Sequence, residues 1–195
     1  MDEQPKKYLG WAFWSMWVLV NSVAWIVGMA LLWLLGIVLD ALTQGVFSLL
    51  GWGVAGALFG AFFGVNHWFL FRPLESLAVK RWVHWWVLVT MGGWSVAILL
   101  VFGLKIREAW GFGLTGAVLG FFSSLPQWWL LRAYVQKAAW WVGLSTVVWA
   151  GAMALLASPE SVQIIAFPFV GVLSGAATGA VMIWLLRHPR VAEEV

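Results

Sequence analysis

Three polar side chains recur within long hydrophobic stretches of this chain, and each lies between two tryptophans. The three sets are Trp17, Asn21 and Trp25, then Trp86, Thr90 and Trp94, and finally Trp141, Ser145 and Trp149. Residues four positions apart lie on one face of a helix. If the three helices surround one axis, Asn21, Thr90 and Ser145 form a polar ring inside a tryptophan cage, which could bind a lipid, a quinone or a carotenoid. The alternative is that these residues only hydrogen-bond between neighbouring helices.

A second set has the chemistry of a pigment ligand. His67 and Gln127 occupy equivalent places in two similar segments, and both side chains can ligate the central metal of a chlorophyll or a haem. Trp68 and Trp128 follow them directly and have flat rings that stack on such a macrocycle. The alternative is that both polar groups bond to lipid headgroups or to helix ends. The sequence leaves the cofactor unknown, with a pigment and a lipid as the candidates.

Arginine ends three of the apolar segments, as Arg72, Arg132 and Arg187. An arginine at such a place stops a helix and extends its guanidinium to the phosphate headgroups. A cluster of the three would instead bind an anionic lipid or the acidic surface of a partner protein. The sequence leaves both interpretations open.

Patterns of catalytic or metal-binding residues are absent from the sequence. It contains no cysteine, no set of Ser, His and Asp at a readable spacing, and no metal-binding His spacing. Charged residues fall at the ends of the apolar stretches, which argues against a proton-coupled transporter. We therefore expect no catalytic residues, no metal site and no enzymatic activity.

The elements that carry these residues are membrane spans. Of 195 residues, 63% are hydrophobic and 10% are charged, and the mean hydropathy is +0.91. A soluble protein of this length has too little interior for so much apolar surface. Stretches of about 20 apolar residues predict six transmembrane helices, over residues 8–39, 42–72, 82–102, 110–132, 138–157 and 162–187. Pro126 is expected to break the fourth of them.

Basic residues predict how these helices are oriented. Six spans place both termini on one side of the membrane, and nine of the eleven Lys and Arg residues fall on that side. Only Lys105 and Arg107 fall on the other side. The positive-inside rule then makes both termini cytoplasmic. The basic pI of about 9.6 reflects this topology and gives no evidence for nucleic-acid binding.

An internal repeat predicts the architecture. The second, fourth and sixth spans each contain a strip of small residues with four-residue spacing. The strips are Gly56, Gly60 and Gly64, then Gly116, Gly120 and Ser124, and finally Gly171, Gly175 and Gly179. Together with the tryptophan ladders they define three tandem helical hairpins, at about 8–72, 80–132 and 138–187, within a single transmembrane domain of residues 1–195. Because small residues let helices approach closely, we expect each glycine zipper to pack against a tryptophan ladder, with pseudo-threefold symmetry about the membrane normal.

The second glycine strip leads into Gln127, Trp128, Leu130, Leu131 and Arg132. This segment resembles a group of multi-pass membrane proteins of cyanobacteria and Chloroflexi that have Gly-zipper and Trp-Leu-x-Leu-Arg repeats. In the first and third repeats, His67 and Met182 replace the glutamine. The resemblance implies a similar fold and a bacterial inner or thylakoid membrane, and it implies no activity.

These observations predict a non-enzymatic membrane protein that acts as a scaffold or accessory subunit. Its expected partners are membrane lipid and either a larger, photosynthetic membrane complex or further copies of this chain. The alternative prediction is a binding protein or carrier for a hydrophobic small molecule such as a pigment, a carotenoid, a quinone or a lipid. The two differ in the space between the odd-numbered helices, because indole rings that fill this space would leave no room for a ligand.

Overall fold

The computed structural model describes residues 9–43, 48–74 and 83–189. Six long helices make up most of these segments. They are α2 (Trp11–Thr43), α3 (Ser48–Phe71), α4 (Val83–Gly103), α5 (Ile106–Leu131), α6 (Ala139–Ala154) and α7 (Glu160–Leu186). Two short 3-10 helices follow α3 and α6, namely η1 (Arg72–Leu74) and η3 (Leu155–Ala157). The described part of the chain is all-α, apart from an isolated β-bridge between Val135 and Pro189.

Five of the six helices are long and apolar enough to cross a membrane. Lipid offers no partner to the backbone, and a helix satisfies its own N–H and C=O groups. The chain is therefore a multi-pass membrane protein. The remaining helix, α5, has 26 residues but is more polar, because it carries Ser123, Ser124 and Gln127. All three side chains are buried inside the bundle, so these polar groups of α5 face other helices.

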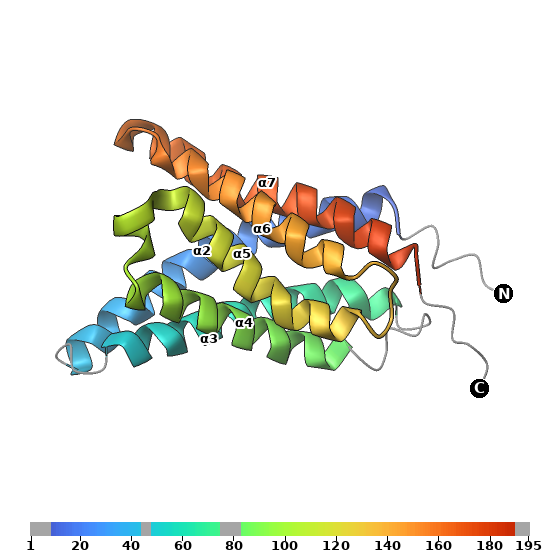
Figure 1. Ribbon diagram of the computed structural model, residues 1–195, viewed down its shortest axis with the longest axis horizontal. Helices are drawn as coiled ribbons and strands as arrows, with labels where there is room; N and C mark the ends of the chain where they lie inside the picture. Colours follow the sequence, from blue (N-terminus) through green and yellow to red (C-terminus); the bar gives the residue numbers. More distant parts are fainter. Residues whose placement is uncertain (1–8, 44–47, 75–82, 190–195) are drawn as a thin grey trace.

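The helices form a closed ring, in which each packs on the next and α7 packs on α2. Figure 1 shows that consecutive helices alternate in direction. The Arg187 guanidinium donates a hydrogen bond to the carbonyl of Leu9, which joins the first and the last described segments. This closure places each helix between two neighbours and leaves a shared interior.

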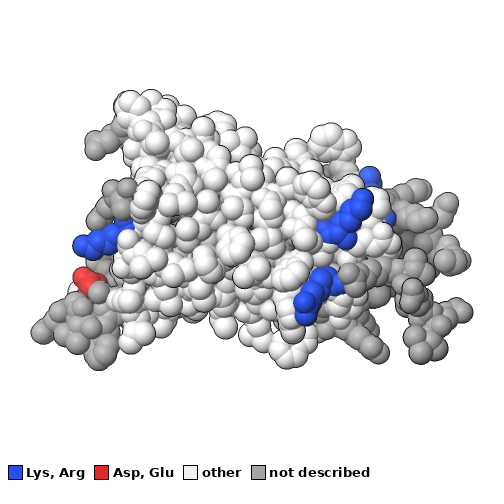
Figure 2. Space-filling model, in the orientation of Figure 1, with Lys and Arg blue, Asp and Glu red and all other residues white. Residues whose placement is uncertain are grey.

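Charged side chains mark the two ends of the bundle. We call one the arginine end, defined by Arg72, Arg132 and Arg187, and the other the Lys105 end, defined by Asp40, Lys105, Arg107 and Ser158. On the face shown in Figure 2, Lys and Arg lie toward these two ends and the band between them is uncharged. An uncharged band is what the hydrocarbon of a bilayer requires, because a charge there is costly.

Three helices differ from the sequence-based prediction. Helix α3 begins at Ser48 and not at Leu42, and α5 begins at Ile106 and not at Trp110. Helix α2 continues to Thr43, beyond the expected end at Leu39. The expected break at Pro126 is wrong, because α5 continues through this residue. The residue of α5 with non-helical angles is Gly111, with φ 78° and ψ −177°, a conformation that is essentially restricted to glycine. The break therefore lies at the Lys105 end.

The middle glycine of each strip lies against a facing helix. A Cβ atom added to Gly60 would lie 2.7 Å from the carbonyl oxygen of Thr90, and one added to Gly120 would lie 2.6 Å from that of Ser145. At Gly175 the added atom would lie 2.9 Å from the Cβ of Asn21. In the order of the ring, α3 thus packs on α4, α5 on α6, and α7 on α2. Close backbone approach is the packing that small residues permit in membranes.

Buried tryptophans form two layers along the bundle axis. The layer nearer the arginine end contains Trp17, Trp86 and Trp141. The layer nearer the Lys105 end contains Trp25, Trp94 and Trp149. Each ladder therefore contributes its first indole to one layer and its second indole to the other, and its polar residue lies between them.

Candidate functional site

Asn21, Thr90 and Ser145 line one space between the two tryptophan layers, as the ladder spacing predicts. Polar residues of α3, α5 and α7 line the same space. Ser123 and Ser124 of α5 also line it, and we call six of the polar residues, one from each helix, the polar layer: Asn21, His67, Thr90, Gln127, Ser145 and Thr178. All six residues are buried, and they come from all six helices.

His67 joins the first ladder to the second. Its ring stacks on the indole of Trp17, with ring centroids 4.2 Å apart and an interplanar angle of 5°. The Trp86 indole N–H donates to Nδ1 of His67 over 3.4 Å. The amide nitrogen of Asn21 lies 3.2 Å from Nε2 and donates to the carbonyl of Trp17 over 2.8 Å. Both ring nitrogens that could ligate a pigment metal thus have protein groups within hydrogen-bonding distance.

Gln127 makes the equivalent connection between the second and third ladders. Its amide nitrogen donates to Oγ1 of Thr90 over 2.9 Å, and its amide oxygen accepts from the indole N–H of Trp141 over 2.8 Å. Like His67, it bridges the polar residue of the preceding helix and the first tryptophan of the following helix. His67 and Gln127, which occupy the same position in two repeats, therefore connect the neighbouring helices in the same way.

The third copy departs from this arrangement, because Met182 stands where His67 and Gln127 stand in the others. The Trp17 indole instead donates to Oγ1 of Thr178 over 3.1 Å, one helical turn earlier on α7. Thr178 in turn donates to the carbonyl of Ser174. Sequence reasoning missed Thr178, although a search for a polar residue one turn from Met182 would have found it.

The polar layer is closely packed. The space that it encloses has a volume of about 30 Å³, enough for about one water molecule. No buried side-chain nitrogen or oxygen of the described residues lacks a hydrogen-bond partner. Sites for small organic ligands are usually about 300 Å³ or larger. The volume does not favour a lipid, quinone or carotenoid within this ring.

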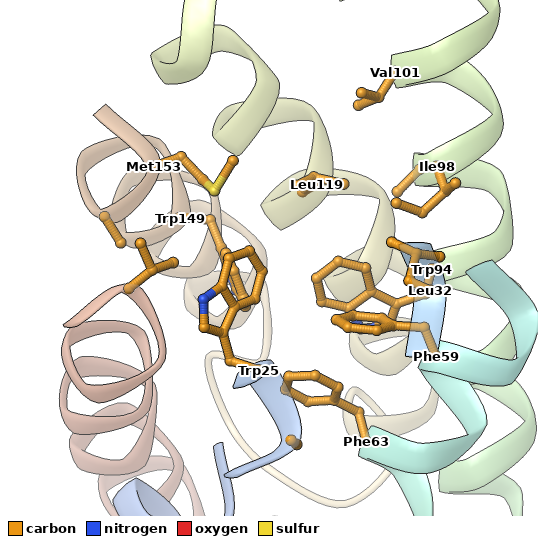
Figure 3. Packing of buried hydrophobic residues seen from close by; sticks show 14 of the residues in the cluster. Trp25, Leu32, Phe59, Phe63, Trp94, Ile98, Val101, Leu119, Trp149 and Met153 are labelled. Carbon is orange, nitrogen blue, oxygen red and sulfur yellow. The ribbon is translucent and has the colours of Figure 1, made fainter. Parts of the chain in front are cut away.

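A much larger cavity lies beyond the second tryptophan layer, toward the Lys105 end. Its volume is about 330 Å³. Trp25 and Trp94 form its floor, and apolar residues of five helices and η3 form its walls, among them Leu32, Ile98, Leu119, Met153, Leu156 and Phe167. Figure 3 shows this region, with Trp25, Trp149, Trp94 and Phe59 gathered below Leu119, Met153, Ile98 and Val101. Trp149 lies 5.4 Å from Trp25 and 5.3 Å from Trp94 between ring centroids, which closes the floor.

Polar side chains line the same cavity toward the end of the bundle, namely Lys105, Arg107, Thr115 and Gln163. Local backbone features place Lys105 and Thr115, and the Arg107 guanidinium lies 5.9 Å from the ring of Phe112. Lys105 has left-handed angles, φ 49° and ψ 41°, at the tight turn between α4 and α5, and Thr115 donates to the carbonyl of the non-helical Gly111. Sequence reasoning missed this cavity, although Lys105 and Arg107 were already conspicuous as the two basic residues of their side.

The arginines of the other end have separate contacts. The Arg72 guanidinium lies 5.3 Å from the ring of Trp68, and that of Arg132 lies 5.5 Å from the ring of Trp128. Arg187 bonds to Leu9 as described above. Each arginine thus contacts its own helix or a neighbouring segment, and binding of an anionic lipid by the three together stays a prediction.

Within the segments that the structure describes, no three His, Asp or Glu side chains are placed to share a metal ion. Comparison of the chain with protein-family models, curated proteins and solved structures finds no match. The geometry of the two spaces inside the bundle is therefore the basis for a functional proposal.

Proposed function

We propose that the chain is a membrane-embedded binding protein for a hydrophobic small molecule, which occupies the cavity at the Lys105 end. The observation that carries this proposal is an apolar space of about 330 Å³ that residues of five helices enclose, next to a polar layer whose space is about 30 Å³. Its volume lies in the range of about 300–1,000 Å³ typical of small-molecule sites. An apolar lining with a few polar groups at one side is also typical of such sites.

Filling the cavity tests the proposal. The full chain is purified in an uncharged detergent, and retained small molecules are extracted and quantified by mass spectrometry. We expect the wild type to retain about one apolar molecule per chain, and Leu119→Trp or Met153→Phe to retain far less, because both residues line the cavity. Leu88→Trp is the matched control, since Leu88 lies on the exposed surface of α4. Equal retention by all four proteins would contradict the proposal.

A second candidate is the scaffold or accessory subunit of a larger membrane complex or homo-oligomer. The closed polar layer favours it, because a bundle held by buried hydrogen bonds is a rigid framework. The same experiment separates the two candidates. A wild-type chain that retains no small molecule, with the cavity variants unchanged, would favour the scaffold.

For the membrane arrangement, we propose six spans in three tandem hairpins, with glycine zippers between them and both termini on the cytoplasmic side of a bacterial inner or thylakoid membrane. The burial of the polar residues of α5 supports this, as does the excess of basic residues at the arginine end among the residues that the structure describes, where Arg72, Arg132, Lys137 and Arg187 compare with Lys105 and Arg107 at the other end. Reporter fusions after Val195 and within Lys105–Glu108 test it. We expect reports from opposite sides, and identical reports would overturn the six-span arrangement.

A further inference from the structure

We propose that the molecule bound at the Lys105 end is a single-chain amphiphile with an anionic headgroup, whose acyl tail fills the cavity while Lys105 and Arg107 bind the anion. This inference rests on the proposed function and deepens it by naming the chemical class of the ligand.

The first argument is the location of positive charge. Nine of the eleven basic residues belong to the opposite side in the sequence, and only Lys105 and Arg107 belong to this side. Both line the one apolar cavity described above. The positive-inside rule disfavours basic residues in short outer loops. No carboxylate is among the described residues that line the cavity, so its two cations would pair with an anionic group bound there.

The second argument concerns the donors that a ligand headgroup would find. The hydroxyl of Thr115 already donates to Gly111 over 2.9 Å. The amide nitrogen of Gln163 already donates to the carbonyl of Ser158 over 2.8 Å. The cationic groups of Lys105 and Arg107 therefore supply most of the donors for a headgroup. Hydrogen bonds from cations to anionic oxygens are about twice as strong as neutral ones, which favours a carboxylate or a phosphate.

The third argument concerns the size and depth of the cavity. Trp94 at the floor and Lys105 at the top are separated by eleven positions of the chain, which at about 1.5 Å per residue is a depth of about 16 Å. This is about half of the roughly 30 Å hydrocarbon core of a bilayer. A depth of one leaflet and a volume of about 330 Å³ suit one acyl chain better than a two-chain lipid or a large ring system.

Binding of cis-parinaric acid and of its methyl ester tests the inference, because the two probes share one fluorescent tail and differ in charge. Energy transfer from Trp25, Trp33 and Trp94, which line the cavity, reports binding to the full chain in nanodiscs of uncharged lipid. We expect the acid to bind at least about tenfold more tightly than the ester, as follows for hydrogen bonds to charged groups. Lys105→Gln combined with Arg107→Gln should reduce the affinity for the acid to that for the ester. Arg132→Gln, at the arginine end, is the matched control and should change neither.

The outcomes separate this inference from the proposed function. Equal affinities for acid and ester, unchanged in the double variant, would overturn the anionic ligand and leave the binding function intact. Binding of neither probe, or binding unaffected by Leu119→Trp, would overturn both. Displacement of the bound acid by dodecanoate or by dodecyl phosphate then shows whether a carboxylate or a phosphate is preferred. Equal displacement by dodecyltrimethylammonium would contradict any preference for an anion.

Discussion

Residues of all six helices line the polar layer, and residues of five of these helices and of η3 line the cavity at the Lys105 end; the two spaces differ by about tenfold in volume, 30 Å³ against 330 Å³. In the polar layer, Trp17, Trp86 and Trp141 each donate an indole N–H to a side chain of another helix. Every such bond requires two helices to stay close together. At the Lys105 end one indole bond of this kind joins two helices, from Trp25 to the carbonyl of Phe167 over 2.9 Å, and most of the other side chains that line the cavity are apolar.

Besides the replacement by Met182 in the polar layer, two departures from the repeat lie at the open end. Helix α2 is the longest, with 33 residues, and α5 changes direction at Gly111. Neither feature has a counterpart at the arginine end of the same helices. The comparison suggests that the repeated side chains close the bundle, while the parts that differ between repeats create the space for a ligand.

The largest effect is expected where backbones touch beside the polar layer. Gly120→Leu should destabilise the fold by about 3 kcal/mol or more, because an added Cβ would lie 2.6 Å from the carbonyl oxygen of Ser145. Thermal unfolding in detergent measures this. Gly143→Leu is the control, since nothing lies within 4 Å of an added Cβ there. Similar melting temperatures for the two variants would place the Gly120 strip toward lipid.

Two leucines compare the packed and the open region directly. Leu131→Ala, in the buried cluster of the arginine end, should cost about 3 kcal/mol, whereas Leu119→Ala, which is also buried but lies at the wall of the cavity, should cost about 2 kcal/mol. The difference follows because a side chain beside an existing space has fewer neighbours to lose. Chemical unfolding of both variants in the same detergent is the measurement, and a larger loss for Leu119→Ala would argue against an open cavity.

Removing a bridge in the polar layer should have an intermediate effect. Gln127→Met copies the residue of the third repeat, but it leaves the Trp141 indole and the Thr90 hydroxyl without a partner. We expect a loss of about 2 kcal/mol in the same unfolding assay. Gln136→Met is the control, because Gln136 is exposed. No difference between the two would mean that the buried bonds contribute little.

The smallest effect is expected at the kink of α5. Gly111→Ala should cost about 1 kcal/mol, because φ 78° with ψ −177° is strained for any residue with a Cβ. The amount of retained small molecule should also fall, because the kink at Gly111 shapes the cavity wall near Arg107 and Thr115. Gly151→Ala, at an open position on α6, is the control. Unchanged stability and unchanged retention in Gly111→Ala would contradict a role of the kink in shaping the cavity.

Much of the closed region follows from spacing in the sequence. The i, i+4, i+8 pattern of the ladders predicts that Asn21, Thr90 and Ser145 face a common space, and the structure confirms this. The positions of the glycines predict which helix faces approach closely. These features are readable because they repeat, and because a polar side chain inside a membrane needs a protein partner.

The open region could not be predicted in the same way. The cavity is lined by apolar residues such as Leu32, Ile98 and Leu119. An apolar residue type is equally suited to a packed interior and to the wall of a cavity, so the sequence does not distinguish the two. The direction of the hydrogen bonds was also missed, because His67 and Gln127 were considered as pigment ligands and not as acceptors for Trp86 and Trp141. Pro126 shows a further limit, because the sequence alone does not distinguish a proline that a helix tolerates from one that ends the helix.

Accessibility of single cysteines tests most directly whether the bundle is closed at the polar layer and open at the Lys105 end. The chain has no cysteine of its own, so Ser145→Cys and Leu119→Cys each introduce one reporter thiol. Labelling with N-ethylmaleimide, followed by mass spectrometry, should be at least about tenfold faster at position 119 than at position 145. A saturating amount of cis-parinaric acid should protect position 119 alone. Equal labelling at the two positions, or rapid labelling at position 145, would contradict the account.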